Sequence, residues 1–206
     1  MMDALLEFFE TAARLQNELR LCRMADGARQ PVSSHSFMMS LMAVVLGPKV
    51  KDKLDMERVL KLCAVHDLPE SLAHDVPFHK TAADAAAKAR KHECESDAIT
   101  RLSDMAGAPE LTELWREYED EKTGESKFVR MLDKLEVVLT VLFGRDLDYL
   151  DKVDDGVYWK IYYSDDFRAR FDGDPFLSAI FGETRRRIGA RIKSELGKNP
   201  EDFKER

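Results

Sequence analysis

Apolar residues recur at spacings of three and four along most of this chain, which is the periodicity of amphipathic helices. Glycine and proline, the residues that interrupt helices, number only 10 and 7 among 206. No run of alternating β-branched residues is long enough for a sheet, and no segment repeats another. The spacing therefore predicts an all-α fold. The predicted helices span residues 3–24, 35–46, 56–66, 81–106, 109–120, 125–142, 155–170 and 174–196.

Polar caps and helix breakers mark several of these boundaries. We expect Ser33 or Ser34 to cap the second helix, because serine side chains satisfy the free N–H groups of a first turn. Gly47-Pro48 is expected to end the same helix. Asp55 is expected to cap the third.

The chain length fits one domain. With 206 residues and no linker, we expect a single domain over residues 1–206, with its core at about residues 5–145 and further helices at about 155–196. A chain of this length buries roughly 70% of its unfolded surface and needs no disulfides. The three cysteines lie far apart in the sequence, which favours a reduced, cytoplasmic compartment.

The charges and the hydropathy of the sequence argue against a secretory signal, a membrane-spanning helix and a nucleic-acid partner. The first ten residues carry acidic side chains where a secretory signal would carry basic ones. No apolar stretch approaches the roughly 20 residues that span a bilayer. The formal net charge of −7 disfavours a nucleic-acid polymer, which requires a dense basic surface. A small anionic ligand is compatible with this charge, because a metal ion and a few arginines can outweigh it locally.

One adjacent pair, His66-Asp67, is the strongest chemical signal in the sequence. His35 lies about thirty residues upstream of the pair and Asp133 about sixty-five downstream, each at the edge of an apolar helical pattern. Imidazole and carboxylate are ligand types that suit a hydrolytic divalent metal. Four such ligands from three helices would leave coordination positions open for water and substrate. The set therefore predicts a metal site.

Each of these residues also has a simpler interpretation. A single histidine near an apolar helix is usually a hydrogen-bonded core residue, and an isolated aspartate is usually solvated. Asp133 departs from that pattern, because Leu132 and Leu135 flank it and burying an unpaired carboxylate costs several kcal/mol. A bound cation would offset that cost. The spacing alone leaves both interpretations open.

Four runs of residues resemble the HD-domain metal-dependent phosphohydrolases, and most closely their 5'-deoxynucleotidase branch. The runs are Ser34-His35-Ser36-Phe37, Val65-His66-Asp67-Leu68-Pro69-Glu70, Asp75-Val76-Pro77 and Phe128-Val129-Arg130-Met131-Leu132-Asp133-Lys134-Leu135-Glu136. The match in order and spacing covers roughly residues 5–145. The resemblance implies a helical bundle around a divalent metal ion, with manganese, cobalt, magnesium, zinc and iron as candidates.

The resemblance also implies roles for individual residues. Glu70 and Asp75 correspond to the carboxylates that assist the chemistry in this branch, and Arg20 corresponds to a phosphate contact. Lys80 is a further candidate for phosphate binding, although such a lysine is more often simply solvated. The four metal ligands of the family correspond to His35, His66, Asp67 and Asp133.

Three positions depart from the pattern of the family. Ser34 stands where an acidic residue often precedes the first histidine, and His74 where a glycine commonly precedes the aspartate. Leu21 replaces an aromatic residue that packs near the sugar in some deoxynucleotidases. The change at Leu21 puts a preference for deoxyribose in doubt, whereas none of the three changes alters a metal ligand.

The predicted activity is that of a metal-dependent 5'-nucleotidase that removes phosphate from (deoxy)nucleoside monophosphates. A dNTP triphosphohydrolase is an alternative, and would need more basic residues at the cleft. A non-catalytic nucleotide-binding HD protein is another. A di-iron HD oxygenase would need extra histidines, for which His74 and His79 are the candidates. The family also implies a homodimer, with the apolar helices after residue 140 as candidates for its interface.

Overall fold

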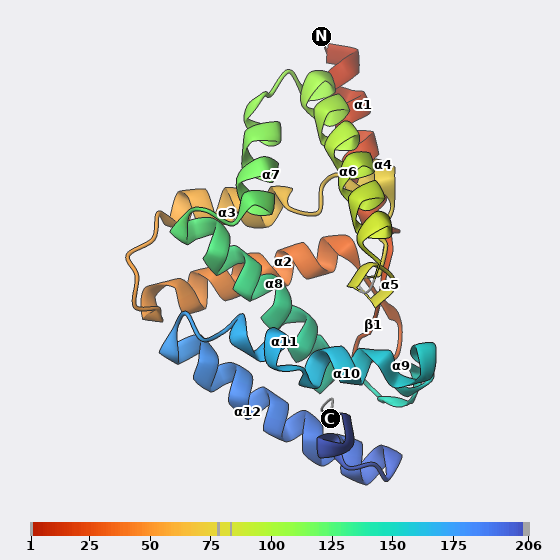
Figure 1. The fold of residues 1–206 in the computed structure, drawn as a ribbon. Coiled ribbons are helices and arrows are strands. Elements are labelled where there is room, and N and C mark those ends of the chain that lie inside the picture. The colour runs from red at the N-terminus through yellow and green to blue at the C-terminus, as the bar shows by residue number, and fades with distance from the viewer. Residues whose placement is uncertain (1, 78, 83, 204–206) are drawn as a thin grey trace.

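Helices make up nearly all of the regular structure (Figure 1). The computed structural model describes residues 2–77, 79–82 and 84–203. The all-α prediction is confirmed, with one small antiparallel sheet added. The elements are α1 (Met2–Ala12), β1 (Leu19–Arg23), β2 (Arg29–Pro31), α2 (Val32–Leu46), α3 (Met56–Val65), α4 (Glu70–Ala73), α5 (His79–Ala82), α6 (Ala85–Ala106), α7 (Glu110–Asp120), α8 (Gly124–Phe143), α9 (Asp148–Asp151), α10 (Val157–Tyr163), α11 (Asp165–Ala169) and α12 (Pro175–Arg191).

Helix α8 lies at the centre of the fold. It packs against α2, α3, α7 and α12, and Figure 1 shows it crossing α2 and running towards the C-terminal helices. Its apolar stripe includes Val129, Leu132 and Leu135, all fully buried. Burial of one such side chain stabilises a fold by roughly 1.5–3 kcal/mol. The same stripe carries Asp133 into the interior.

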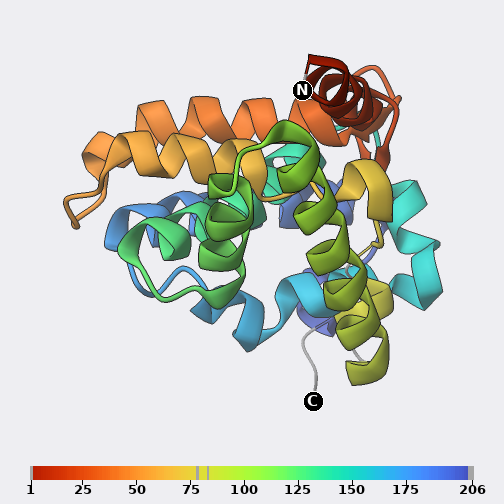
Figure 2. The ribbon, with the colours of Figure 1, turned by 90° about the horizontal axis from the view of Figure 1, so that it is seen from above.

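Helices α2 and α3 run side by side, as Figure 2 shows from above. The chain reverses direction between them at the 3-10 turn Gly47–Lys49. The first turn of α2 and the last turn of α3 therefore lie at the same end of the pair. His35 lies in that first turn, and His66 follows that last turn.

The prediction of a single helix over residues 3–24 is wrong. Helix α1 ends at Ala12, and β1 pairs with β2 in an antiparallel hairpin. Gly27 lies in the turn with a φ of 88°, a conformation that glycine adopts without strain. Residues four apart lie on the same face in a helix and also in a strand, where every second residue shares a face. The apolar spacing therefore did not distinguish a helix from a strand. As a result, Arg20 lies on a strand and not on a surface helix.

Helix α2 begins at Val32, earlier than predicted, because β2 runs directly into it. Pro31 occupies the N-cap position, so Ser33 and Ser34 lie inside the first turn and the predicted serine cap is wrong. The backbone N–H of Val32 instead donates to the carbonyl of Glu18. The helix ends before Gly47, as predicted.

Polar caps begin several other helices. Asp55 accepts hydrogen bonds from the backbone N–H groups of Glu57 and Arg58, which confirms its predicted role. Asp84 caps α6 in the same way, and Thr123 caps α8. Each cap of this kind typically contributes about 1 kcal/mol.

The C-terminal helices turn their aromatic side chains inward. The helix predicted over residues 155–170 is two short helices, because α10 ends at Tyr163 and the Ser164 hydroxyl caps α11. Trp159 is fully buried, and the rings of Phe171 and Phe181 stack with centroids 4.2 Å apart. Among the described residues, no helix is both long and apolar enough to cross a bilayer.

Candidate metal centre

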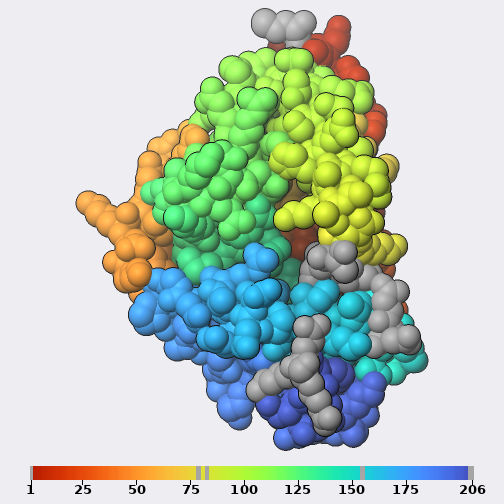
Figure 3. All heavy atoms as spheres, in the orientation of Figure 1, coloured from red at the N-terminus to blue at the C-terminus, as the bar shows by residue number. Residues whose placement is uncertain are grey.

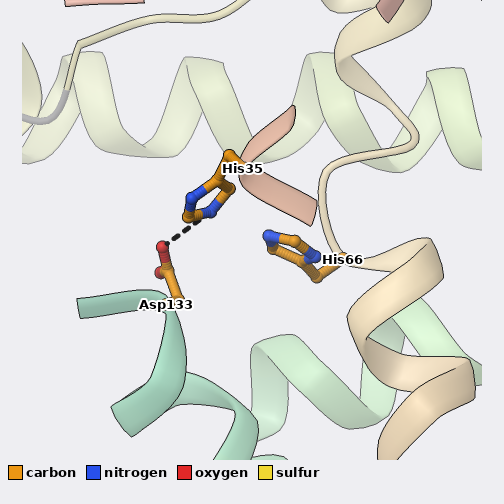
Figure 4. A group of neighbouring side chains, drawn as sticks. All are labelled: His35, His66 and Asp133. Atoms are coloured by element: carbon orange, nitrogen blue, oxygen red, sulfur yellow. Dashed lines mark ion pairs between the residues drawn. The ribbon is translucent and has the colours of Figure 1, made fainter. Parts of the chain in front are cut away.

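Three helices bring two histidines and an aspartate into one buried group (Figure 4). His35 comes from α2, His66 follows α3, and Asp133 comes from the middle of α8. One ligand atom from each lies within 4.8 Å of the others, and all three side chains are buried. Nε2 of His35 is 3.3 Å from Oδ1 of Asp133. The group has the spacing that a single metal ion needs.

Asp67 lies at the edge of the same group. Its Oδ2 atom is 3.2 Å from Nε2 of His66 and 3.7 Å from Nε2 of His35. Its side chain is more exposed than the other three, and it belongs to the turn that leads from α3 to α4. The structure thus gathers all four predicted ligands, three of them in the buried group and Asp67 beside it.

Both imidazole rings present a free nitrogen to the centre of the group. Within the described residues, Nε2 of His35 and Nε2 of His66 are buried and lie 3.3 Å and 3.2 Å from carboxylate oxygens of Asp133 and Asp67, but neither nitrogen has a hydrogen bond. The opposite nitrogens are held, since Nδ1 of His66 donates to the carbonyl of Cys63 at 2.9 Å and Nδ1 of His35 faces Glu136. A buried polar atom without a partner is costly, and a cation between the rings would satisfy both. The residues present therefore fit a divalent metal.

Glu136 is a buried carboxylate next to the group that the sequence analysis did not identify as a site residue. It is 2% exposed, and its Oε1 accepts hydrogen bonds from the Gln30 amide at 2.7 Å and the Thr140 hydroxyl at 2.8 Å. The signal was available in the sequence. Glu136 follows Asp133 by three residues in the same apolar stripe, so it also had to be a compensated buried carboxylate.

The second oxygen of Asp133 is also occupied. The Tyr118 hydroxyl donates to Oδ2 at 3.0 Å, and the Lys134 ammonium donates to the same atom at 2.9 Å. Burial opposes ionisation of Asp133, but Lys134 and His35 hold its pKa well below the usual value. Tyr118 is buried in the core, so it packs there and also fixes this carboxylate.

Arg20 lies against the carboxylates of the group. Its guanidinium is 2.8 Å from Oδ2 of Asp67 and 3.9 Å from Oδ1 of Asp133. Burial opposes its charge, but the surrounding carboxylates raise its pKa and keep it cationic.

Glu70 is a deeply buried carboxylate at the start of α4. It is 3% exposed, and its Oε2 atom is buried without a hydrogen-bond partner among the described residues. Burial, and then the negative charges of Asp67 and Asp75, raise the pKa of Glu70 to about 10. A group perturbed in this way is typical of sites that carry out proton transfer.

Asp75 follows a strained turn that Glu18 holds in place. Burial raises the pKa of Asp75, although Arg20 opposes that rise. The two oxygens of Glu18 face the backbone N–H of Asp75 and Nδ1 of His74, each at 3.0 Å. His74 has a φ of 65°, a conformation in which glycine is favoured, and it occupies the position where the family commonly has glycine.

Lys80 and His74 are not brought into the group. Lys80 lies on α5 and its side chain is exposed. Of the two histidines considered for a second iron, His74 has a side chain that is 77% exposed, and the side chain of His79 lies outside the described part of the chain. Figure 3 shows a hollow between α6 and α8. The atoms at the bottom of the hollow have the red-brown colour of the first part of the chain.

Comparisons with known proteins indicate the family of this chain. The HD domain family matches residues 12–153. A 5'-deoxynucleotidase HDDC2 of Danio rerio is 36% identical over 143 residues, which are 67% of this chain and 68% of that relative. The 5'-deoxynucleotidase HDDC2 of Homo sapiens is 31% identical over 151 residues, which are 71% of each chain.

Solved structures share the fold. The crystal structure of a protein named as a predicted metal-dependent phosphohydrolase, from Magnetospirillum magnetotacticum MS-1, matches with a TM-score of 0.69 and 25% identity over 91% of this chain and 94% of that chain. A conserved protein from Pyrococcus furiosus matches with a TM-score of 0.63 and 26% identity over 88% and 99%. With a family match over more than half of its length, relatives above 30% identity and a shared fold, this chain belongs to the HD domain family.

Proposed function

We propose that this protein is a metal-dependent 5'-nucleotidase that hydrolyses (deoxy)nucleoside monophosphates. Relatives named 5'-deoxynucleotidase and a structural neighbour named as a metal-dependent phosphohydrolase support this activity. The observation that carries the proposal is the pair of buried Nε2 atoms, on His35 and His66, that have no hydrogen-bond partner among the described residues. A cation is the ligand that satisfies both atoms at once.

A divalent metal ion is the implied cofactor. Manganese, cobalt, magnesium, zinc and iron are the candidates, and the mixed nitrogen and oxygen donor set suits a hydrolytic transition metal best. When bound, the ion would lower the pKa of a coordinated water and neutralise charge on a phosphoryl oxygen. The proposed ligands are His35, His66, Asp67 and Asp133.

In this proposal, Glu70 accepts a proton from the nucleophilic water and Asp75 donates a proton to the leaving group. Glu70 orients the nucleophilic water and accepts its proton at Oε2, the oxygen that has no partner within the described structure. Its ionised form is favoured by a neighbouring divalent charge. Asp75, whose pKa is raised by burial, holds a proton for the leaving 5'-oxygen.

Arg20 and Lys80 are the proposed phosphate contacts. Arg20 carries its charge beside the ligand group, and its planar fork matches the non-bridging oxygens of a phosphate. Lys80 is exposed on α5, so it is proposed as an outer contact only. The net charge of −7 makes a nucleic-acid polymer an unsuitable substrate.

The competing activity is the release of tripolyphosphate from a dNTP. Phosphate release from dAMP and tripolyphosphate release from dATP, measured side by side with Co²⁺ or Mn²⁺, distinguish the two. We expect phosphate from dAMP as the main product. Tripolyphosphate as the main product would overturn the monophosphatase proposal, and the absence of both activities across all metals would favour a non-catalytic nucleotide-binding protein.

Site variants test the roles within this activity. Glu70→Gln should lower kcat by about 10²–10⁴-fold, the usual contribution of a general base. The bound metal should stay, because Glu70 is not a proposed ligand. Glu93→Gln, at an exposed position of α6, is the matched control and should leave kcat unchanged. Full activity of Glu70→Gln would remove Glu70 from the mechanism.

The sugar preference depends on a position next to Arg20. Leu21 is partly buried on β1, in place of the aromatic residue of some deoxynucleotidases. Without an aromatic ring to pack against C2' of the sugar, we expect AMP and dAMP to be hydrolysed at similar rates. A Leu21→Trp variant should shift the ratio of kcat/KM towards dAMP. A strong preference of the unmodified enzyme for dAMP would show that another residue selects the sugar.

We also propose a homodimer, with its interface on α2. Large apolar side chains on this helix are exposed at helical spacing, with Phe37 at 67%, Leu41 at 46% and Val44 at 56%. The helices after α8 are a poorer candidate than the sequence indicated, since aromatic residues such as Trp159, Tyr162 and Phe181 are buried within the fold. A contiguous apolar face of this kind is typical of self-association.

Light scattering tests the dimer. The unmodified protein should have twice the chain mass, and Leu41→Glu should give a monomer. A monomeric unmodified protein would refute the dimer.

We also propose that the chain forms a single domain and that it is cytoplasmic. The core of buried apolar residues runs without interruption from Cys22 to Ile192, so the C-terminal helices share it with the residues that match the family. All three cysteines are free, and Cys94 is exposed, which suits a reducing compartment. One cooperative thermal transition of the whole chain would support one domain, whereas two separate transitions would contradict it.

A further inference from the structure

Lys91, on α6, is a lysine that reaches the candidate site. Its ammonium lies 3.8 Å from Oε1 of Glu70 and forms an ion pair with Glu95, one turn along the same helix. Glu70 and Glu95 are 3% and 8% exposed, and the side chain of Lys91 is 26% exposed. A lysine between two buried carboxylates differs from the solvated lysine that a charged helix would normally carry.

The other cations of the site form their ion pairs with different carboxylates. Arg20 and Lys134 form their ion pairs with proposed metal ligands. Lys91 instead pairs with Glu70, the proposed base. Burial opposes the charge of Lys91, but Glu95 and then Glu70 raise its pKa, so the ammonium stays protonated. The site therefore has a permanent positive charge next to its base.

The contact places the two oxygens of Glu70 in different environments. Oε1 faces the Lys91 ammonium, whereas Oε2 is buried without a hydrogen-bond partner among the described residues. Helices α4 and α6 lie side by side, as Figure 1 shows, so the contact joins two neighbouring elements. Glu95 limits where the ammonium can move, because it holds Lys91 from within the same helix. One oxygen of Glu70 thus faces a positive charge at ion-pair distance, and the other has no hydrogen-bond partner among the described residues.

We propose that Lys91 is a positioning residue for Glu70, holding Oε1 so that Oε2 is presented to the nucleophilic water, with Glu95 fixing the ammonium in place. The inference rests on the proposed function, because it requires Glu70 to act as the base. Lys91 itself touches neither the substrate nor the reacting atoms. Its loss should therefore slow turnover without weakening substrate binding.

A kinetic comparison of three variants tests this role. Lys91→Met keeps the length of the side chain and removes the charge, Lys91→Arg keeps the charge, and Lys88→Met removes an exposed lysine of the same helix. With dAMP and Mn²⁺ or Co²⁺, we expect Lys91→Met to lower kcat about 10-fold or more with KM within about 2-fold. Lys91→Arg should recover most of kcat, and Lys88→Met should match the unmodified enzyme.

Two kinetic results would overturn the inference while the proposed function stands. One is an active enzyme whose kcat is the same with and without Lys91. The other is a Lys91→Met variant whose KM rises about 10-fold with kcat unchanged, because that pattern belongs to a substrate contact. An unmodified enzyme without activity on any nucleotide would instead overturn the proposed function, and the positioning role with it.

Thermal unfolding without substrate tests the contact independently of activity. The fall in Tm is measured for Lys91→Met, for Glu70→Gln and for the double variant. If the two side chains interact, the fall in the double variant should differ from the sum of the two single falls. Strict additivity would mean that Lys91 does not hold Glu70, and would overturn the inference even if the kinetics had changed.

Discussion

Nδ1 of His35 lies 2.5 Å from Oε2 of Glu136, a residue one helical turn beyond Asp133 on α8. Burial opposes ionisation of Glu136, but the hydrogen bond with His35 lowers its pKa, so the carboxylate is ionised and can only accept. Nδ1 of His35 must then carry the ring proton. In the neutral ring, which is the form that binds a metal ion, Nε2 then has a free electron pair directed at the candidate metal centre.

Glu136→Gln should weaken metal binding. The amide can still accept the hydrogen bond from His35, but it lacks the negative charge that makes the imidazole a better donor to the metal. We expect the affinity for Mn²⁺ or Co²⁺ to fall by about 10- to 100-fold, the usual effect of losing such a partner. Titration calorimetry measures the change, with Glu93→Gln as a control. An unchanged affinity would mean that Glu136 only fills space in the core.

His66→Ala should remove the metal altogether. The substitution deletes one of the two free Nε2 atoms and leaves three ligands, of which Asp67 is partly exposed. Elemental analysis of the purified protein should show about one equivalent for the unmodified chain and far less for the variant. His92→Ala is the matched control, because His92 is exposed and stacks on Trp115. Equal metal in all three proteins would contradict the site.

The sequence indicated much of the site because buried charge stands out in an apolar stripe. Asp133 could be identified as compensated because Leu132 and Leu135 surround it, and the same argument applied to Glu136 would have found the partner of His35. The approach of His35 and His66, by contrast, depends on α2 and α3 running in opposite directions. Local spacing carries no information about that packing.

Two features could not be predicted from local patterns. The hairpin of β1 and β2 was missed because its apolar spacing also fits a helix, and a strand of five residues pairs only when its partner is present. Lys91 was hidden in a charged segment of α6 that is typical of a solvated surface. The side chain turns inward towards two buried carboxylates, Glu95 on the same helix and Glu70 on a separate element.

His74→Gly should stabilise the protein. His74 has a φ of 65° and a ψ of 153°, a region in which residues other than glycine lose roughly 1–3 kcal/mol. Its ion pair with Glu18 is exposed at the histidine side and contributes only about 0–1 kcal/mol. We expect the free energy of unfolding in urea to rise by about 1 kcal/mol. His74→Ala, which keeps the strain and loses the ion pair, should not be stabilised, and equal stabilisation of both variants would contradict the argument.

Asp174→Asn should make the protein less stable in a way that depends on pH. Burial alone would raise the pKa of Asp174, but the backbone N–H groups of Lys51, Leu177 and Phe176 donate to it and lower its pKa below the usual value. One carboxylate thus caps α12 and also ties it to the segment after α2.

The sign of the pH effect follows from that lowered pKa. An aspartate with a lower pKa in the folded than in the unfolded chain stabilises the fold at any pH above its unfolded value of 3.8. That contribution is lost as the pH falls through the folded pKa, whereas asparagine is neutral throughout. Urea unfolding should therefore show the unmodified protein about 1–2 kcal/mol more stable than Asp174→Asn at pH 7, with the difference closing below about pH 4. A difference that stays constant down to pH 2 would mean that the charge of Asp174 makes no contribution and that only the shape of the cap matters.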